Sequence, residues 1–267
     1  MGHILARSLK ASPSIVLMLI FSVDILCADD LNDNNRSKSS FKGAIGIGVV
    51  TKTRYEGSRE YTQKAVPVLE MSYKSFFISP LRGIGISIPL SQEFEIAPSI
   101  SIYSKRPEWE MEKRGETASF NDLRAAASIS ATYRYGRIAS SAWVLKRLSA
   151  DDGMLVGLKI GCMNTIGEQW MLNLSVSAEY ADKKYNQALF GITPEQSGEY
   201  HFDIYEAKSG FKDIGINASI SYRITKTLSI SAVGGYKRLL DIAANSPIVK
   251  DGTADQYRVG IIMSHRI

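Results

Sequence analysis

The sequence predicts an all-β protein: an antiparallel transmembrane β-barrel of about twelve strands, with both termini in the periplasm. Three observations predict it, namely repeated apolar–polar alternation, a secretion signal, and alternating long and short connections. Residues 168–180 show the alternation best, since Trp170, Leu174 and Tyr180 fall on one face of a strand and Asn173 on the other. Many such segments behind a secretion signal are typical of a barrel with lipid outside and water inside.

The start of the chain has the order of a secretory signal peptide. Arg7 and Lys10 precede an apolar run from Ile15 to Cys27, and Ala28 is a small residue before a polar stretch. The run is shorter than the roughly 20 apolar residues that span a bilayer as a helix. We expect cleavage after Ala28. The expected organisation is a signal peptide, a periplasmic N-terminal segment and a transmembrane barrel, at residues 1–28, 29–42 and 43–267.

Composition and cysteine usage narrow the class further. The formal net charge of +5 is mild and spread along the chain, so we expect no nucleic-acid partner. Cys27 lies in the expected signal peptide, which leaves Cys162 without a partner for an intramolecular disulfide. Cys162 is in phase with Leu158 and Ile160, so we expect its side chain on the lipid face rather than in a reactive site.

The alternation recurs often enough to place every strand. We expect twelve strands, at residues 43–53, 64–73, 75–80, 83–89, 93–104, 121–134, 137–149, 153–164, 168–180, 210–223, 226–238 and 255–266. An even number lets the barrel close with both termini on one side. A single strand over 75–89 would give eleven, and ten strands is the main alternative. The apolar face of 138–148 is either Trp143 with Leu145 or Ala142 with Val144.

The connection lengths agree with this topology. Bacterial outer-membrane barrels have short periplasmic turns and longer outer loops. The expected periplasmic turns are all short, at residues 74, 90–92, 135–136, 165–167 and 224–225. Four of the six outer connections are long, and the six lie at residues 54–63, 81–82, 105–120, 150–152, 181–209 and 239–254.

A water-soluble lipocalin-like barrel is the structural competitor, because period two alone does not tell inside from outside. Twelve strands exceed the roughly eight that close around a core of side chains. Aromatic residues near strand ends, such as Trp170, Tyr222 and Tyr257, are typical of the girdles at a membrane interface. We therefore expect the apolar faces to meet lipid.

Three segments of the mature chain carry a resemblance to a known family. They lie at residues 76–85, 181–198 and 236–249, and the second holds Tyr185-Asn186 and Phe190-Gly191-Ile192-Thr193. The third holds a Leu-rich strand end followed by Asn-Ser-Pro-Ile. In order and spacing these segments resemble the MipA/OmpV family, the MltA-interacting proteins of Gram-negative outer membranes. Barrels of this kind usually end on an aromatic residue, whereas this chain ends on Ile267.

The resemblance implies a non-enzymatic scaffold in the Gram-negative outer membrane. Such a scaffold would link a lytic transglycosylase to a penicillin-binding peptidoglycan synthase, besides contacting outer-membrane lipid. The periplasmic turns and the segment 29–42 would then face the partners. That segment is polar, which is more typical of a flexible tail than of a docking motif.

The residues predict no catalytic, cofactor-binding or metal site, and no cofactor. Beyond the signal peptide the histidines are His201, in the loop 181–209, and His265, on the outward face near the C-terminus. A hydrolase needs a nucleophile, a base and an orienting group within hydrogen-bond reach, and no serine spacing here suggests such a group. Two histidines so far apart do not suggest a metal site.

A small outer-membrane channel or porin is the alternative function, and a surface antigen or adhesin acting through the loops 105–120 and 181–209 is another. The charged side chains expected to face the lumen are Glu70, Glu95, Asp122, Arg124, Arg134, Lys159, Glu179, Asp213, Arg223 and Arg258. They could line a pore or pair with one another and close it. We expect mutual pairing inside a small lumen.

Overall fold

A computed structural model describes residues 41–104, 108–116, 122–149 and 153–267. The expected signal peptide and most of the segment 29–42 lie outside these residues. The strands are β1 (Phe41–Thr53), β2 (Tyr61–Tyr73), β3 (Phe76–Ser79), β4 (Gly83–Ile86), β5 (Ile88–Pro89), β6 (Phe94–Ser104), β7 (Leu123–Tyr135), β8 (Ile138–Arg147), β9 (Met154–Ile166), β10 (Trp170–Ala181), β11 (Gly210–Arg223), β12 (Leu228–Leu239) and β13 (Asp255–Arg266). The helices are α1 (Glu108–Lys113), α2 (Lys183–Phe190), α3 (Pro194–Tyr200), α4 (Asp241–Ala244) and α5 (Pro247–Asp251).

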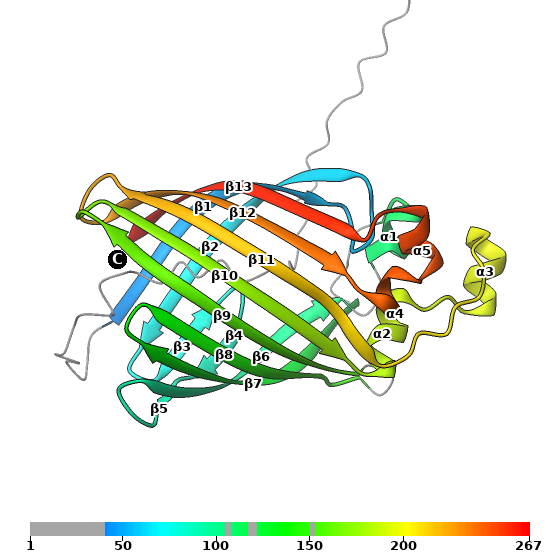
Figure 1. Cartoon of the computed structure of the whole chain (residues 1–267), viewed down its shortest axis with the longest axis horizontal. Coiled ribbons are helices and arrows are strands. Elements are labelled where there is room, and N and C mark those ends of the chain that lie inside the picture. The colour runs from blue at the N-terminus through cyan, green and yellow to red at the C-terminus, as the bar shows by residue number, and fades with distance from the viewer. Residues whose placement is uncertain (1–40, 105–107, 117–121, 150–152) are drawn as a thin grey trace, which may run out of the picture.

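The strands form one closed antiparallel sheet (Figure 1). Strands next to each other in the chain pair in turn, except that β6 pairs with both β4 and β5, and β1 pairs with β13. Because β4 and β5 are separated by Ser87 alone and both lie against β6, they form one interrupted wall strand. The wall therefore has twelve strands, which confirms the predicted count. The stretch 75–89 forms two wall strands rather than one.

The hairpin at 75–89 is short because proline and close packing limit its strands. Pro80 and Pro89 lack the N–H that a ladder needs, and they lie at the ends of β3 and β5. Gly83 begins β4 with a φ of 80°, and a Cβ there would lie 2.1 Å from the Ile100 carbonyl oxygen. Only glycine fits a backbone that turns this way and approaches β6 so closely.

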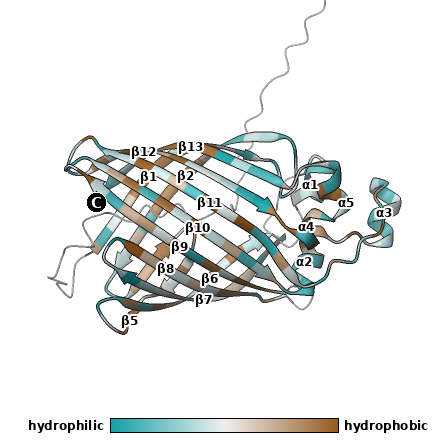
Figure 2. Cartoon of the chain, in the orientation of Figure 1, coloured by the Kyte–Doolittle hydropathy of each residue, from teal (hydrophilic) through white to brown (hydrophobic). Residues whose placement is uncertain are grey.

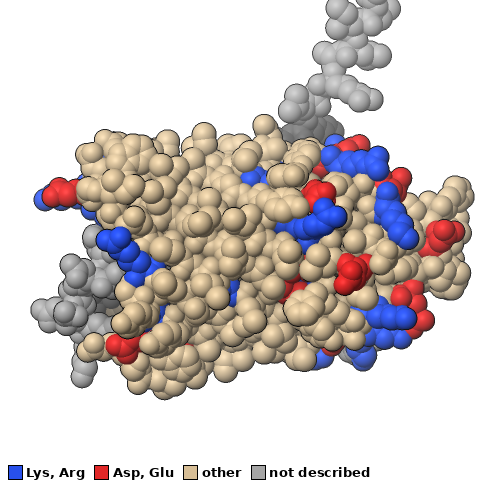
Figure 3. All heavy atoms as spheres, viewed as in Figure 1, with Lys and Arg blue, Asp and Glu red and all other residues tan. Residues whose placement is uncertain are grey.

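The outer face of the wall is apolar. Leu158, Leu174 and Val176 are each more than half exposed, whereas Asn173 and Ser175, which alternate with Leu174 and Val176 along β10, are partly covered inside the barrel. Hydrophobic residues recur along the strands of the wall in Figure 2. Charged side chains gather toward the two ends of the face seen in Figure 3. The predicted outward apolar face is confirmed, and a lipocalin-like arrangement is wrong because it would bury these side chains.

The structure decides which face of 138–148 is apolar. Ala142 and Val144 are exposed on the outer face of β8, and Trp143 and Leu145 point inward. The Trp143 ring lies over its cross-strand partner Gly157, where a Cβ would lie 2.0 Å from the ring atom Cζ2. The glycine thus makes room for a tryptophan inside the barrel.

The two ends of the barrel differ. Short turns and the C-terminus lie at one end, which we call the terminal mouth, and α1 to α5 gather at the other, which we call the capped end (Figure 1). Aromatic pairs mark the outer wall near both ends. Trp170 and Tyr222 pair near the terminal mouth, with ring centroids 4.7 Å apart. The pairs near the capped end are Tyr180 with Phe211 and Tyr236 with Tyr257.

Among the described residues, none of the helices has the length and apolar character needed to cross a bilayer.

We expect Gly157→Ala to destabilise the barrel by about 1–3 kcal/mol, because the new methyl group would displace the Trp143 ring inside a packed wall. Guanidinium unfolding of the detergent-folded protein, followed by the mobility difference of boiled and unboiled samples on a gel, measures this. Gly234→Ala is the matched control, since a Cβ there meets nothing within 4 Å. Equal losses in both variants would contradict the packing of Trp143.

Candidate functional site

The long connections at the capped end pack into a cap with its own hydrophobic core. Phe190 from the β10–β11 connection packs against Leu239 at the end of β12 and against Ala243 and Val249 from the β12–β13 connection. A second group brings together Trp109, Ile192 and Ile248 from three connections. A third group joins the cap to the wall and consists of Leu155, Ala181 and Tyr185. The cap is therefore a folded unit rather than a set of separate loops.

Short hydrogen bonds start the cap helices and join the connections. The Asp182 side chain accepts from the Tyr185 N–H at 2.8 Å and begins α2. Thr193 and Gln196 form a capping box that begins α3, and the Gln196 amide donates to Glu110 in α1 at 2.9 Å. These contacts explain locally why helices form where the sequence pattern predicts only loops.

The two loop segments that carry the family resemblance meet inside this cap. Ser246 is fully buried, and its hydroxyl donates to the Phe190 carbonyl oxygen at 2.8 Å. Asn186 is also fully buried, and its amide donates to the Lys208 carbonyl oxygen at 2.8 Å. The residues of 185–193 and 239–249 thus have a structural role here, which is to hold the cap together.

A β-bulge places two charged residues inside the barrel below the cap. The pairing of β10 with β11 shifts by one residue between Glu179 and Tyr180, so that Glu179 faces Asp213 and Tyr180 faces Phe211. Lys212 is the extra residue, and both it and Asp213 turn inward and are buried. Strict alternation, by contrast, would send one of the two side chains into lipid.

Five side chains form an ion cluster around this bulge, in which Lys212, Asp213 and Lys237 are buried and Glu56 and Glu179 are partly exposed. The Lys212 ammonium lies 2.6 Å from the Asp213 carboxylate, 2.9 Å from that of Glu179 and 3.3 Å from that of Glu56. Lys237 pairs with Glu56 and lies 3.4 Å from the Asp213 carboxylate. Glu56 comes from the β1–β2 connection, so the cluster ties that loop to β10, β11 and β12.

The cluster holds three carboxylates against two ammonium groups, and two carboxylate oxygens, Glu56 Oε2 and Asp213 Oδ1, are buried without a hydrogen-bond partner. Burial alone would raise the pKa of Glu56, but the ammonium groups of Lys212 and Lys237 outweigh it and hold that pKa well below its usual range. Glu56 therefore stays ionised at physiological pH and keeps both lysines paired.

An arginine lies beside the cluster between two aromatic rings. The Arg147 guanidinium is buried and stacks 4.2 Å from the ring centroid of Tyr185 and 4.6 Å from that of Tyr103. Burial raises the pKa of the Tyr185 hydroxyl, although Arg147 opposes the shift. This stack joins β6 and β8 of the wall to α2 of the cap.

The structure accounts for most of the charges predicted to face the lumen. Glu179 and Asp213 belong to the ion cluster, as described above. Glu95 lies 3.5 Å from Arg134, and Arg258 donates to Asn217 at 2.7 Å. The Glu70 carboxylate accepts from the Ser79 hydroxyl at 2.8 Å. Arg124 donates to the Leu123 carbonyl oxygen at 2.8 Å. Glu95, Arg134, Glu179 and Asp213 thus form ion pairs, as expected, whereas Glu70, Arg124 and Arg258 have hydrogen bonds to neutral groups.

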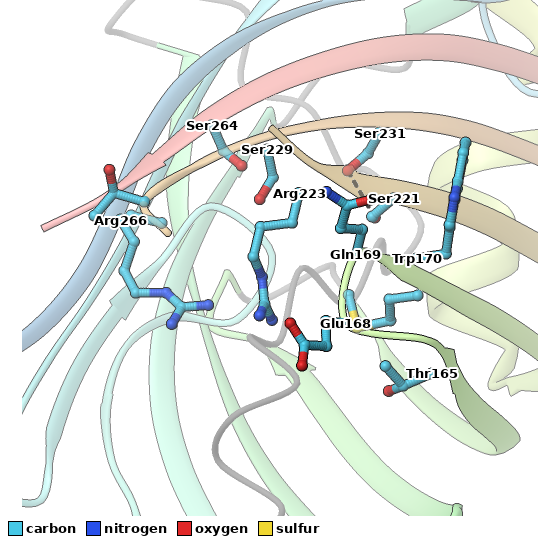
Figure 4. A pocket seen from close by; sticks show the side chains of 13 residues that line it. Thr165, Glu168, Gln169, Trp170, Ser221, Arg223, Ser229, Ser231, Ser264 and Arg266 are labelled. Carbon is cyan, nitrogen blue, oxygen red and sulfur yellow. Dashed lines mark hydrogen bonds between the residues drawn. The ribbon is translucent and has the colours of Figure 1, made fainter. Parts of the chain in front are cut away.

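The terminal mouth contains an open pocket, and the space within it, part of which is open solvent, is about 610 Å³. Figure 4 shows Arg223 and Arg266 extending into the same space as Glu168. Hydroxyl groups line one wall, and Ser221 and Ser231 form a hydrogen bond of 2.7 Å within it. Most of the residues that line the pocket are polar, with two arginines against one glutamate, and Ala44, Trp170 and Met171 add apolar surface.

The structure does not bring the two mature histidines together. His201 is exposed at the end of α3 in the cap, and His265 is exposed on the outer face of β13 near the terminal mouth. Cys162 is exposed on the outer face of β9, as its phase predicts. Within the described ranges, no group of three or more His, Cys, Asp or Glu side chains could hold a metal ion.

A closed antiparallel wall that is apolar outside and polar inside defines an outer-membrane β-barrel of a Gram-negative cell. A family model described as "MltA-interacting protein MipA" matches residues 45–267. The chain therefore belongs to that family.

Solved structures give distant likenesses. The NanC porin shares 9% identity over 82% of this chain and 98% of that chain, with a TM-score of 0.47. An outer membrane channel from Pseudomonas putida F1 shares 8% identity over 86% and 96%, with a TM-score of 0.42. The outer membrane protein OmpT of Vibrio cholerae shares 6% identity over 85% and 98%, with a TM-score of 0.41. No curated protein matches the chain.

We expect Lys212→Met to destabilise the capped end by about 3–5 kcal/mol, because it leaves buried carboxylates without their counter-charge. Guanidinium unfolding followed by tryptophan fluorescence measures the loss. Adding Asp213→Asn to this variant should restore part of it. Lys208→Met, at an exposed position in the same connection, is the control. A loss no larger than that of the control would show that the cluster does not support the cap.

The depressed pKa of Glu56 also sets a pH dependence. A carboxyl whose pKa falls on folding contributes stability above its ordinary value of 4.5 and loses it as the pH falls through the folded-state pKa. The stability difference between the wild type and Glu56→Gln should therefore be constant from about pH 8 to about pH 5 and shrink below about pH 4.5. A difference that disappears near neutral pH would contradict the pairing of Glu56 with the two lysines.

Proposed function

We propose that this protein is a closed structural barrel that acts as a scaffold. In this proposal the terminal mouth and both termini face the periplasm, and the cap faces the outside of the cell. The periplasmic surface would link a lytic transglycosylase to the penicillin-binding peptidoglycan synthesis machinery. The proposal gives the chain no reaction of its own.

The observation that best supports a closed barrel is the burial of the ion cluster beneath the cap. Asp213 and Lys212 are 1% and 3% exposed although both point into the lumen. An aqueous pore past these side chains would wet them. The interlocked cores formed by Phe190 and Ile192 favour the same interpretation, because they join connections from different sides of the barrel.

Two further observations support the scaffold and its orientation. The family description names an interaction with MltA, which makes a partner for this chain a reasonable expectation. Short connections lie at the terminal mouth, and barrels of this membrane have their short turns in the periplasm. Together they favour a mouth that meets periplasmic partners.

A small channel is the second candidate, because polar side chains also line the lumen between the two ends. Lys159 and Arg258, for example, lie on the inner face and are partly exposed. In the channel case the cap would open during transport.

Planar-bilayer recordings separate the two candidates. We expect the full-length wild type to give no stable conductance steps. A variant in which residues 186–206 are replaced by a short Gly-Ser linker should conduct, because it removes Phe190 and Ile192 from the cap core. Stable open steps from the wild type, similar to those of the linker variant, would favour the channel.

Crosslinking in intact cells tests the scaffold. A photo-crosslinking residue at Lys226, in the turn between β11 and β12, should recover murein enzymes. The same residue at Ser197, partly exposed on α3 in the cap, should not. Failure to recover a murein enzyme from Lys226, or equal recovery from both positions, would argue against the scaffold in this orientation.

A further inference from the structure

The hairpin formed by β3 and β4 covers only part of the height of the wall. β2 pairs with β1 over thirteen residues but with β3 over only three, at 71–73. On the other side of the hairpin, β6 pairs with β4 only at Ser99 and Ile100. The ring of paired strands stays continuous, but among the described residues no strand pairs with 65–69 on the side away from β1. We call the part of the wall between 65–69 of β2 and Ile102 of β6 the wall notch.

The hairpin ends in an ordered turn that is tied to β2. The Ser79 hydroxyl accepts from the N–H groups of Leu81 and Arg82, at 3.2 and 3.4 Å. The same hydroxyl donates to the Glu70 carboxylate at 2.8 Å. Pro80 has no N–H with which to extend the ladder. The wall notch therefore begins at a fixed height and is a built feature of the wall.

The edge of β2 at the wall notch has the residues of an edge strand. Pro67 lacks an N–H, and Lys64 is a charged side chain that points inward, so both disfavour pairing with a strand of another chain. Tyr61 and Tyr73 are exposed at the two ends of β2, which places this edge within the lipid layer. Backbone without a strand partner is tolerated at that depth only where it lines protein or a water-filled cavity. The edge at the wall notch therefore opens onto the lumen.

An arginine lies on the inner face at the base of the wall notch. The Arg82 guanidinium stacks 4.2 Å from the ring centroid of Phe77, which points inward and is buried. It lies 3.9 Å from the Glu95 carboxylate, which is too far for a hydrogen bond, and Arg134 is closer to that carboxylate at 3.5 Å. Across the ranges that the structure describes, no group accepts a hydrogen bond from the Arg82 guanidinium, and its side chain is 43% exposed. Its N–H donors can therefore bind a ligand.

The depth of Arg82 in the wall gives this arrangement its significance. The neighbouring Gly83 packs against the carbonyl group of Ile100, in the middle of β6. A charged side chain at such a depth in the membrane is costly and is typical of a ligand or ion pathway. Leu69 and Ile102, on the two sides of the wall notch, are exposed to lipid on the outer face. Hydrocarbon thus meets one side of the wall notch, and a guanidinium lies on the other.

We propose that the wall notch binds a single-chain anionic amphiphile, whose hydrocarbon chain passes through the notch into the lipid and whose carboxylate or phosphate group is bound by Arg82 inside the lumen. A guanidinium binds both kinds of anion in bidentate fashion. A fatty acid and a lysophospholipid share this chemistry. The site lies in the wall rather than at the terminal mouth, so it does not depend on the scaffold role.

The direct test uses palmitic acid that carries a photoreactive diazirine in the middle of its chain, with the full-length protein in zwitterionic nanodiscs. After illumination, mass spectrometry should find adducts at Val68 and Ser101, which point inward beside the wall notch. Ser175 and Ser177 point inward where the wall is fully paired, and they should carry none. The methyl ester of the probe lacks the anionic group and should label outward side chains only.

Substitution of Arg82 tests the anion site. R82Q should lower the labelling of Val68 and Ser101 about fivefold or more, because the bidentate partner of the anion is lost. R82K keeps the charge and should retain part of the labelling. Labelling of Leu174, on the outer face of β10, should not change in either variant. The gel shift on boiling reports whether each variant is folded.

Substitution of Ala65 tests the wall notch itself. Ala65→Trp places a bulky side chain at the notch edge and should lower the inward labelling by about twofold or more, since packed side chains leave little free space. Ala232→Trp, at an exposed position on the outer face of β12 where the wall is fully paired, is the matched control and should leave it unchanged.

The remaining outcomes decide against the proposal or identify the head group. Unchanged labelling of Val68 and Ser101 in a folded R82Q protein would overturn the anion site. Equal labelling of Ser175 would mean that the probe enters through the terminal mouth, which would overturn the wall notch. Competition by unlabelled oleate alone would support a carboxylate ligand, and competition by lysophosphatidylglycerol alone would support a phosphate ligand. Competition by neither would also overturn the proposal.

Discussion

The structure depends on one constraint, which is that every backbone hydrogen bond inside the lipid layer must be made within the protein. A sheet satisfies this only by closing, and here closure rests on the pairing of the interrupted strand β4–β5 with β6. The outward apolar side chains, the inward polar side chains and the short turns at the terminal mouth all follow from a closed wall in lipid. The inward position of Trp143 over Gly157 also follows, because the interior of a closed wall must be filled by side chains or by water.

A closed wall leaves a lumen, and the side chains that line this lumen differ between the two ends of the barrel. At the capped end a bulge of one residue turns Lys212 inward beside Asp213, and the β1–β2 loop adds Glu56 to the cluster. Removing these charges from water is costly unless each is paired, so the cluster specifies one arrangement of loop and wall. At the terminal mouth, Arg223 and Arg266 are among the residues that line an open pocket. The buried ion pairs and packed connections of the capped end are the features on which the proposed closed scaffold rests.

Much of this fold could be predicted from the sequence because period two is a direct consequence of strand geometry. It located the wall strands, and the outward position of Leu174 and Cys162 followed from phase alone. The alternation could not predict which face of 138–148 is outward, because both faces are equally apolar. The space above Gly157, seen only in the structure, explains why Trp143 points inward.

The candidate site was much harder to predict. Period two cannot show a bulge, so Lys212 was missed, and Lys237 and Glu56 have no local pattern that marks them as partners. The cap depends on contacts between residues far apart in the chain, such as Ser246 with Phe190. The N-cap residue Asp182 and the capping box at Thr193 were local signals in that connection that could have indicated helices. The family resemblance pointed to the right segments without revealing that they pack on each other.

The most direct measurement of the central claim, a barrel closed by a folded cap, is amide hydrogen exchange of the full-length protein in nanodiscs. The N–H groups of Ile192 and Val249 are hydrogen-bonded within buried packing, whereas α3 has no buried residues. We predict that 185–193 and 239–249 exchange as slowly as the adjoining ends of β11 and β12, and that α3 exchanges fast. Fast exchange of both segments, at the rate of α3, would contradict a closed cap.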